Sequence, residues 1–189
     1  MTTFVDLLSS GDLRSDGFSN EVARIVAERP DLLPHLLDAL TSTDRSVRGH
    51  AADALEKVSR GHPFEVASFL PQVVRTAQTD DVPMVRWHLA MVLGHLAVVP
   101  RTIPQARRAL RALLRDPSAF VRSWAISSLC IIAKRSPHHA ASIIRAVAPL
   151  TSDPSAAVAK RAQTAIRLLA NPHTALPRTW IKSQHIRDR

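Results

Sequence analysis

Apolar residues recur at helical spacing in four segments of the chain, which begin at Val47, Val85, Val121 and Val158. The four segments align with one another without gaps. When each valine is counted as offset zero, apolar residues return at offsets 4, 7, 8 and 11 in nearly every segment. At 100° per residue these offsets fall within one stripe, which predicts four amphipathic helices that are buried along one side.

These four helices belong to a longer repeat, because the valines are 38, 36 and 37 residues apart. Each is preceded by a second amphipathic stretch, at residues 32–40, 66–77, 103–114 and 140–150. A polar residue five positions before each valine is expected to be the N-cap, and in two repeats a proline follows it at the expected first helical position. Each unit is therefore predicted to be a helix, a tight turn and a helix; the expected caps are Ser42, Asp80, Asp116 and Asp153, with Pro117 and Pro154 after the last two.

A single helical pair cannot bury its apolar face, so the units must stack, with the second helices along the inner surface. We expect a solenoid over residues 1–175, in which a degenerate opening pair (helices at 4–9 and 19–28, the second capped by Ser19 or Asn20) fills residues 1–29. The expected repeats cover residues 30–61, 62–99, 100–136 and 137–171. Residues 172–189 form a proline-interrupted tail that is expected to be either mobile or folded back.

One string gives this repeat a family resemblance. Residues 116–125, Asp-Pro-Ser-Ala-Phe-Val-Arg-Ser-Trp-Ala, resemble the Asp-x-x-x-x-Val-Arg core of the HEAT-repeat (armadillo-like helical solenoid) family, and the similarity extends over about residues 30–170. The resemblance implies an all-α fold, a right-handed α-α superhelix of about four HEAT-type hairpins plus the opening pair. It also implies that Arg48, Arg86 and Arg122 bond aspartates of neighbouring repeats, whereas the fourth repeat has Ala159 at this position. Such folds serve many functions, so the function must be argued from side chains.

The composition fits one helical domain. Hydrophobic residues make up 46% of the chain and aromatic residues 4%, with no tyrosine, which favours helices over sheets. The single Cys130 excludes an internal disulfide and a cysteine-rich zinc site, and it suits a reducing compartment. The first residues lack a signal-peptide pattern, and no apolar run is long enough to span a bilayer. We therefore expect a cytoplasmic protein with no membrane partner.

Charge is distributed unevenly. Residues 1–95 hold 9 Lys and Arg against 13 Asp and Glu, whereas residues 96–189 hold 16 against 3. A balance of +13 in one half favours an acidic partner, although an arginine- and alanine-rich composition would also produce it. Three of these arginines fall on a predicted outer helix and three cations on an inner one, so the basic surface is expected to wrap around the end of the solenoid: Arg108, Arg111 and Arg115, then Lys160, Arg161 and Arg167.

The inner face is predicted from offsets 2, 3 and 6, which point away from the apolar stripe. In repeat order these positions pass from acidic through aromatic to basic: Gly49, His50, Asp53; Trp87, His88, Met91; Ser123, Trp124, Ser127; Lys160, Arg161, Thr164. Trp87 and Met91 are expected to form an apolar ledge of the kind that anchors partners. Two alternatives stay open: Trp87 packs on a neighbouring inner helix or beneath the tail, and Trp124 fills the space between repeats.

The sequence therefore predicts a non-enzymatic binding module that holds a protein or peptide with acidic groups. Sequence-independent nucleic-acid binding through the basic half is the alternative. No catalytic residue, metal or cofactor is expected, and the partner's identity and the oligomeric state stay open. The predicted partner-binding residues are Trp87, His88, Met91, Trp124, Lys160 and Arg161.

Three chemical alternatives are less favoured. A HEAT-like DNA glycosylase would need an acidic residue at helical spacing after a tryptophan, and neither Trp87 nor Trp124 has one. A metal site would need a convergence of histidines and acids from different repeats, with His50, Asp53, His88 and His95 as its candidates. Cys130 could act as a nucleophile beside a histidine, but a lone cysteine in an apolar helix usually serves packing.

Overall fold

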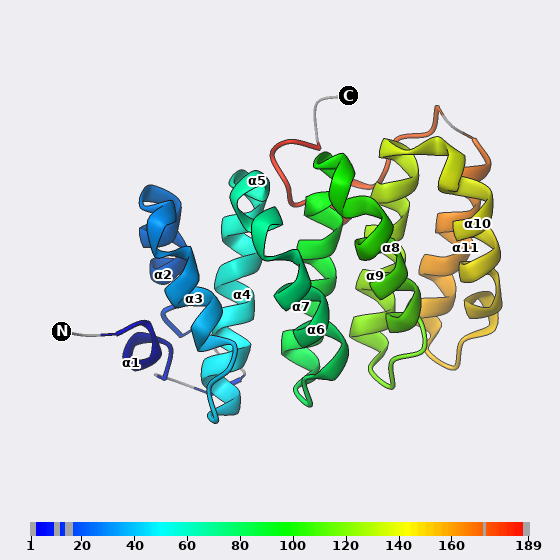
Figure 1. The fold of residues 1–189 in the computed structure, drawn as a ribbon. Coiled ribbons are helices and arrows are strands. Elements are labelled where there is room, and N and C mark those ends of the chain that lie inside the picture. The colour runs from blue at the N-terminus through cyan, green and yellow to red at the C-terminus, as the bar shows by residue number, and fades with distance from the viewer. Residues whose placement is uncertain (1–2, 10–11, 14–16, 172, 187–189) are drawn as a thin grey trace.

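The computed structural model describes residues 3–9, 12–13, 17–171 and 173–186, and over these residues the chain is a helical solenoid without β-strands (Figure 1). The helices follow one another as antiparallel pairs: α1 (Phe4–Leu8), α2 (Ser19–Glu28), α3 (Leu33–Ala39), α4 (Arg45–Gly61), α5 (Pro63–Val66), α6 (Leu70–Thr79), α7 (Pro83–His95), α8 (Ile103–Leu113), α9 (Ala119–Arg135), α10 (Ala140–Val147) and α11 (Ala156–Ala170). Short 3-10 turns precede or extend several of them, and one lies in the tail at Arg178–Trp180.

The helices form two layers. The second helices of the pairs, α4, α7, α9 and α11, pack on one another in succession and form the inner layer. The first helices α3, α6, α8 and α10 cover them on the outside and contact one another less extensively. α2 packs against α4 and extends the inner layer at the N-terminal end (Figure 1). A right-handed superhelix of four hairpins with an opening pair is thus confirmed.

The apolar stripe is the core. Each lead valine is the third residue of its inner helix, and all four are buried. Leu93 and Leu129, at offset 8, are completely buried between the layers. The equivalent Ile166 of the last repeat is only partly buried, because α11 has no following inner helix to cover it.

The predicted N-caps are wrong by two residues. The structure caps the four inner helices with Asp44, Val82, Ser118 and Ser155. The aspartates expected as caps lie earlier, in the turn between the helices, and one carboxylate oxygen of each accepts the backbone N–H two residues later at 2.8 Å, as in an Asx turn. Pro117 and Pro154 consequently lie in the turn and not in the helix. Nor does Ser19 or Asn20 cap α2, which begins after Phe18 without a side-chain cap.

The carboxylates of these aspartates also form a ladder of ion pairs between repeats. Arg86 donates to Asp116 at 2.7 and 3.1 Å, and Arg122 donates to Asp153 at 2.8 Å through both nitrogens. Arg48 reaches Asp80 at 2.8 Å. Each arginine also donates to a carbonyl of its own inter-helix turn. The contacts implied by the family resemblance are confirmed, and they tie each turn to the next.

Two inner helices approach closely at a glycine. A Cβ added at Gly94 of α7 would lie 2.5 Å from the Ser128 hydroxyl of α9 and 3.1 Å from its Cα. The same hydroxyl donates to the Ala90 carbonyl at 2.7 Å. Glycine is therefore required here by the spacing of α7 and α9, which the small Ser128 also permits.

The tail folds back along the solenoid, which decides between the two alternatives for its described residues 173–186. Pro172 and residues 187–189 of the predicted tail lie outside the described part. From α11 the segment runs past α9 and α7 toward α4 and α5, drawn in orange and red in Figure 1. Trp180 is 6% exposed, and Ser183 is completely buried. Within the described residues no helix is long and apolar enough to cross a membrane.

Candidate functional site

The predicted inner-face positions divide into two groups. At offset 3 the side chains lie between neighbouring inner elements and not on the open surface. His50 contacts the carbonyls of Leu8 at 2.8 Å and Asp12 at 3.1 Å, which fixes the N-terminal segment. His88 lies 3.6 Å from Asp53 of α4. These histidines therefore connect repeats, and His88, with 13% of its side chain exposed, offers a partner little surface.

The open part of the inner face is an aromatic pair. Trp87 of α7 is partly buried, and its ring centroid lies 5.2 Å from that of Phe120 at the start of α9. Phe120 is 65% exposed, more than any other large hydrophobic residue in the described part of the chain. Met91, predicted to join Trp87 in an exposed ledge, is instead 6% exposed and belongs to the packed layer.

Phe120 was missed in the sequence because only offsets 2, 3 and 6 were assigned to the inner face. Phe120 stands one residue before Val121, at offset −1. From there its ring reaches Trp87 of the preceding inner helix. A comparison of side-chain size between equivalent positions of the repeats could have identified Phe120. The equivalent residues of the other repeats are Ser46, Met84 and Ala157, so only the third repeat carries an aromatic ring there.

Arg161 connects the last repeat to the tail. Its guanidinium carbon lies 5.2 Å from the ring centroids of both Trp124 and Trp180, and it donates to the Ser127 hydroxyl at 2.7 Å. Burial lowers the pKa of Arg161 from its ordinary value, so the two rings hold a partly desolvated cation. Trp124 and Arg161 are thus brought together, but beneath the tail, whereas Lys160 is exposed on α11.

Buried charges occupy the other end of the inner face. The Asp53 carboxylate accepts from Ser19 at 2.5 Å and from Lys57 at 2.7 Å. Burial opposes its ionisation, but these two hydrogen bonds outweigh that cost, and the pKa of Asp53 lies below its ordinary value. Asp53, Glu56 and His88 have possible ligand atoms within 4.8 Å of one another. Their carboxylates already have cationic partners, Lys57 and Arg60, so the group fits a salt-bridge network better than a metal centre. His50 lies with the N-terminal segment and does not join it.

Ser59, His95 and Glu56 form a buried serine, histidine and acid group. Ser59 Oγ lies 2.7 Å from His95 Nδ1, and His95 Nε2 lies 3.7 Å from Glu56. The Ser59 hydroxyl donates its only proton to the Glu56 carbonyl at 2.7 Å, so His95 must donate to Ser59 and cannot accept its proton. All three side chains are buried. This geometry stabilises α4 against α7 and does not activate a nucleophile.

Cys130 is equally unsuited to nucleophilic chemistry. Its side chain is completely buried in α9, and burial raises the pKa of the thiol to about 12. Since the thiolate is the reactive form, a thiol with this pKa stays protonated at neutral pH. Cys130 is therefore a packing residue, as expected of a lone cysteine in an apolar helix.

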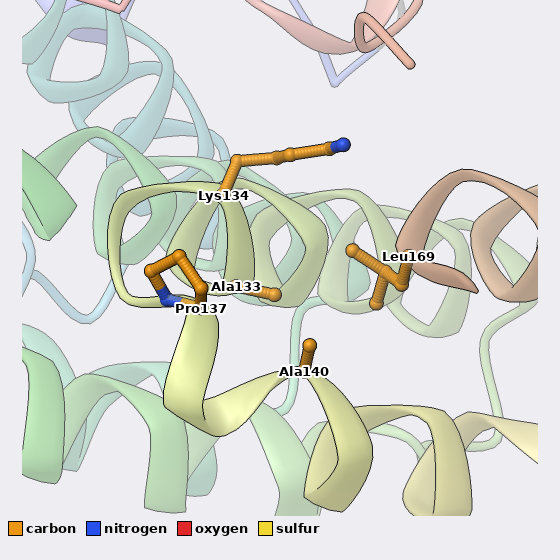
Figure 2. A pocket seen from close by; sticks show the side chains of 5 residues that line it. All are labelled: Ala133, Lys134, Pro137, Ala140 and Leu169. Carbon is orange, nitrogen blue, oxygen red and sulfur yellow. The ribbon is translucent and has the colours of Figure 1, made fainter. Parts of the chain in front are cut away.

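A small cavity lies between α9, α10 and α11 (Figure 2). Its lining residues are Ala133, Lys134, Pro137, Ala140 and Leu169, and its volume is about 100 Å³. In Figure 2 the Lys134 side chain extends away from the apolar side chains around the cavity. Sites for drug-sized ligands or cofactors typically enclose about 300 Å³ or more, so this space is too small for one.

Comparison with known proteins agrees with this architecture. A family model described as HEAT repeats matches residues 33–130. No curated protein matches the sequence significantly. An engineered protein of solved structure superposes with a TM-score of 0.64 at 23% identity, over 88% of this chain and 79% of that chain.

Two further solved structures share the fold. A designed armadillo repeat protein in complex with the peptide (KR)4 has a TM-score of 0.60 at 19% identity, over 89% of this chain and 72% of its own. An archaeal HEAT-like repeats protein from Thermococcus onnurineus NA1 has a TM-score of 0.56 at 18% identity, over 88% of this chain and 63% of its own. At these identities the likeness is one of fold.

Proposed function

The chain belongs to the HEAT-repeat family, and from this premise we propose that it is a non-enzymatic module that holds a protein or peptide partner on its inner face. One observation carries the proposal: the Trp87 and Phe120 rings pack on each other at 5.2 Å, yet Phe120 keeps 65% of its surface exposed. A rigid pair of aromatic rings offers apolar area at a low cost in conformational entropy, as binding hot spots do.

The exposed charge and the helix ends of the inner layer favour a partner with acidic groups. Lys160 is exposed on α11, next to α9 in the inner layer. The N-termini of α7 and α9, where Trp87 and Phe120 lie, also carry the positive end of each helix dipole. Arg161 would take part only after the tail moves, because Trp180 covers it. The designed armadillo repeat protein with its bound (KR)4 peptide supports peptide binding as a use of such a fold.

The experiment compares affinity capture by four versions of the full chain: wild type, Trp87→Ala, Phe120→Ala and Phe18→Ala. Phe18 is the matched control, since it is also an exposed aromatic residue (49%) but precedes α2 at the other end of the solenoid. Partners retained by wild type and Phe18→Ala should be lost by the other two. For a purified partner, calorimetry should show a loss of about 2 kcal/mol or more, roughly thirtyfold in Kd. Equal affinity of all four versions would refute the proposed anchor.

A second candidate, nucleic-acid binding, is favoured by one observation. Arg108, Arg111 and Arg115 are all exposed on or just after α8, in the half of the chain with a charge balance of +13. Because phosphate binding releases counterions, affinity for duplex DNA would fall steeply with salt. A joint Arg108→Ala, Arg111→Ala and Arg115→Ala variant would then flatten the salt slope, whereas Phe120→Ala would not change it. A failure of the wild type to bind DNA at low salt would remove this candidate.

A further inference from the structure

The described tail runs from the end of α11 past α9 to the C-terminal end of α4 almost without regular structure. Between α11 and residue 186 it has one 3-10 turn, Arg178–Trp180, which contacts α9. Arg178, Thr179, Gln184 and His185 are exposed, while Trp180 and Ser183 are buried. The segment therefore lies on the solenoid as an irregular chain with turns at residues 178–180 and 184–186, and with alternating buried and exposed parts.

Its first attachment is a single aromatic side chain. Trp180 is 6% exposed, and its ring centroid lies 5.2 Å from the guanidinium carbon of Arg161, which lies equally far from Trp124. Apart from Arg161, this pocket draws on α9, where both Trp124 and Ser127 contact the guanidinium. A partly desolvated cation is attracted to the faces of aromatic rings, and any tryptophan that reaches this site would gain that interaction.

Its second attachment is to backbone. The carbonyl of Arg60, at the end of α4, accepts from Gln184 N–H at 3.0 Å and from the Ser183 hydroxyl at 3.3 Å. The carbonyl of Gly61 contacts His185 Nε2 at 2.9 Å, and the imidazole packs edge-on against Phe64. The last carbonyls of a helix have no partner within the helix, so they are open to any donor that arrives. Two of the three contacts use the backbone or a small hydroxyl and carry little sequence information.

One charged side chain of the tail lies near the α4 contacts. Lys182 stands between Trp180 and Ser183, and Glu56 of α4 is completely buried beside Arg60. Burial raises the pKa of Glu56, which Arg60 and, to a smaller extent, Lys182 counteract. Lys182 therefore adds only a small electrostatic contribution at this end of the tail.

We propose that residues 177–186 are a tethered occupant of a peptide-binding groove, and that the groove accepts from a partner protein a peptide with a tryptophan in place of Trp180, followed three and four residues later by donors to the last α4 carbonyls. The partner displaces the tail and takes over its contacts with Arg161 and the last α4 carbonyls. The groove is distinct from the Trp87 and Phe120 pair, so the proposal stands or falls independently of that anchor. The tail lowers the apparent affinity for a partner peptide, because a tethered segment competes with it at an effective concentration in the millimolar range.

The test uses the full chain and a fluorescein-labelled synthetic peptide with the sequence of residues 173–186. Two variants loosen the tail without touching the groove: Trp180→Ala removes its anchor, and Gln184→Pro removes the N–H that bonds to Arg60. Fluorescence anisotropy should show the peptide binding to both variants about tenfold or more tightly than to wild type. A peptide with alanine in place of the tryptophan should not bind to any version.

Two further variants in the Trp180→Ala background locate the binding. Trp124→Ala should weaken the peptide at least tenfold, whereas Phe120→Ala should leave its affinity unchanged, which separates this groove from the proposed anchor. Circular dichroism melts identify any variant that has lost its fold, and Gln184→Pro, at an exposed position, provides the loosened tail if Trp180→Ala unfolds. Equal affinity of wild type and both tail variants, or no binding to folded tail variants, would show that the tail is a fixed strap and overturn the proposal.

Discussion

At the scale of single residues, burial acts most strongly on His95. Its imidazole is 2% exposed between α4 and α7, and burial lowers its pKa to about 3, with the positive charges of Arg60 and Lys182 acting in the same direction. The ring is therefore neutral in the folded protein over the whole physiological range. It bonds with Ser59 as a neutral group, and protonation would place an additional charge beside Arg60 in the core.

This predicts an acid-dependent loss of stability that depends on His95. In the unfolded chain the pKa is about 6.5, so below that pH the unfolded state binds a proton that the folded state excludes until about pH 3. The contribution is fully present above pH 6.5 and is lost progressively as the pH falls, by about 2 kcal/mol between pH 7 and pH 5. Urea denaturation at both pH values should show this loss for wild type and a smaller one for His95→Gln.

The pH dependence of wild type must be compared with that of His95→Gln, because Glu56 also contributes to it. Burial raises the pKa of Glu56, so its protonation in the folded state adds stability as the pH falls, which is opposite in sign to the effect of His95. Glu56 is present in both proteins, but its carboxylate lies 3.7 Å from His95 Nε2, so the difference between the two slopes reports His95 together with its contact to Glu56. Identical pH slopes for wild type and His95→Gln would mean that His95 is not held neutral by burial.

At this scale the sequence predicts the exposure of side chains near the surface less well than it predicts the buried stripe. The family resemblance identifies the ladder arginines correctly. Counting offsets along one helix places Trp87 opposite the core, whereas in the structure Trp87 is partly buried, packs against the core and contacts Phe120 of the neighbouring inner helix. The same count places Met91 in the open, where it is buried, and overlooks Phe120, because exposure depends on the neighbouring repeat as much as on the helix itself. Whether Trp87, Trp124 or Lys160 contacts a partner stays a prediction.

At the scale of elements, the arginine ladder determines how one hairpin is held to the next. Arg86 and Asp116 expose only 10% and 6% of their side chains, and they pair through two hydrogen bonds. Asp81, by contrast, is 65% exposed and pairs with Arg48 from the solvent side. Removal of one partner of a buried pair leaves the other charge desolvated and alone, whereas an exposed pair contributes little.

We therefore predict that Arg86→Ala lowers the free energy of unfolding by about 2–4 kcal/mol and that Asp81→Ala changes it by less than about 0.5 kcal/mol. Chemical denaturation monitored by circular dichroism measures both. A double-mutant cycle with Asp116→Ala should give a coupling of about 1 kcal/mol or more, because the two residues contact each other directly. If Arg86→Ala and Asp81→Ala cost the same, the ladder does not hold the repeats together.

The sequence predicted the elements well and their boundaries less well. The 36–38-residue period identified every inner helix, because each repeat must bury the same stripe. The polar residue five positions before each lead valine is interpreted from the sequence as a cap, because in two repeats it is an aspartate followed by proline, which is typical of a helix start. In the structure Asp116 and Asp153 bond with the turn and with an arginine of the preceding repeat, and the second of these contacts is invisible within one repeat.

At the scale of the whole molecule, the tail is the feature that periodicity could not predict. It brings Gln184 to Arg60, more than a hundred residues earlier, through contacts that follow no repeat. The sequence left two alternatives for it, since prolines and a lone tryptophan indicate irregular structure but not its location. Once folded back, the tail connects the last repeat to the first, in a molecule whose other contacts join neighbours.

That neighbour-to-neighbour architecture predicts graded stability along the chain. In a solenoid, stability is approximately a sum over repeats and their interfaces, so a helix with inner neighbours on both sides opens least often. α7 packs between α4 and α9, and α9 packs between α7 and α11, whereas α11 has one inner neighbour. Hydrogen exchange followed by mass spectrometry should find the slowest amides in α7 and α9, and faster exchange in α2, α10 and α11.

Two matched leucine variants test the same gradient. Leu93 in α7 is completely buried, and Leu93→Ala should cost about 2–5 kcal/mol and speed exchange in α4 and α9 as well as in α7. Leu169 in α11 is 7% exposed, and Leu169→Ala should speed exchange in α11 and leave α4 protected, because among the described residues α7 and α9 lie between these two helices in the inner layer. If Leu169→Ala accelerates every repeat equally, the molecule unfolds as one cooperative unit, and the tail that joins its two ends is the contact to examine for that coupling.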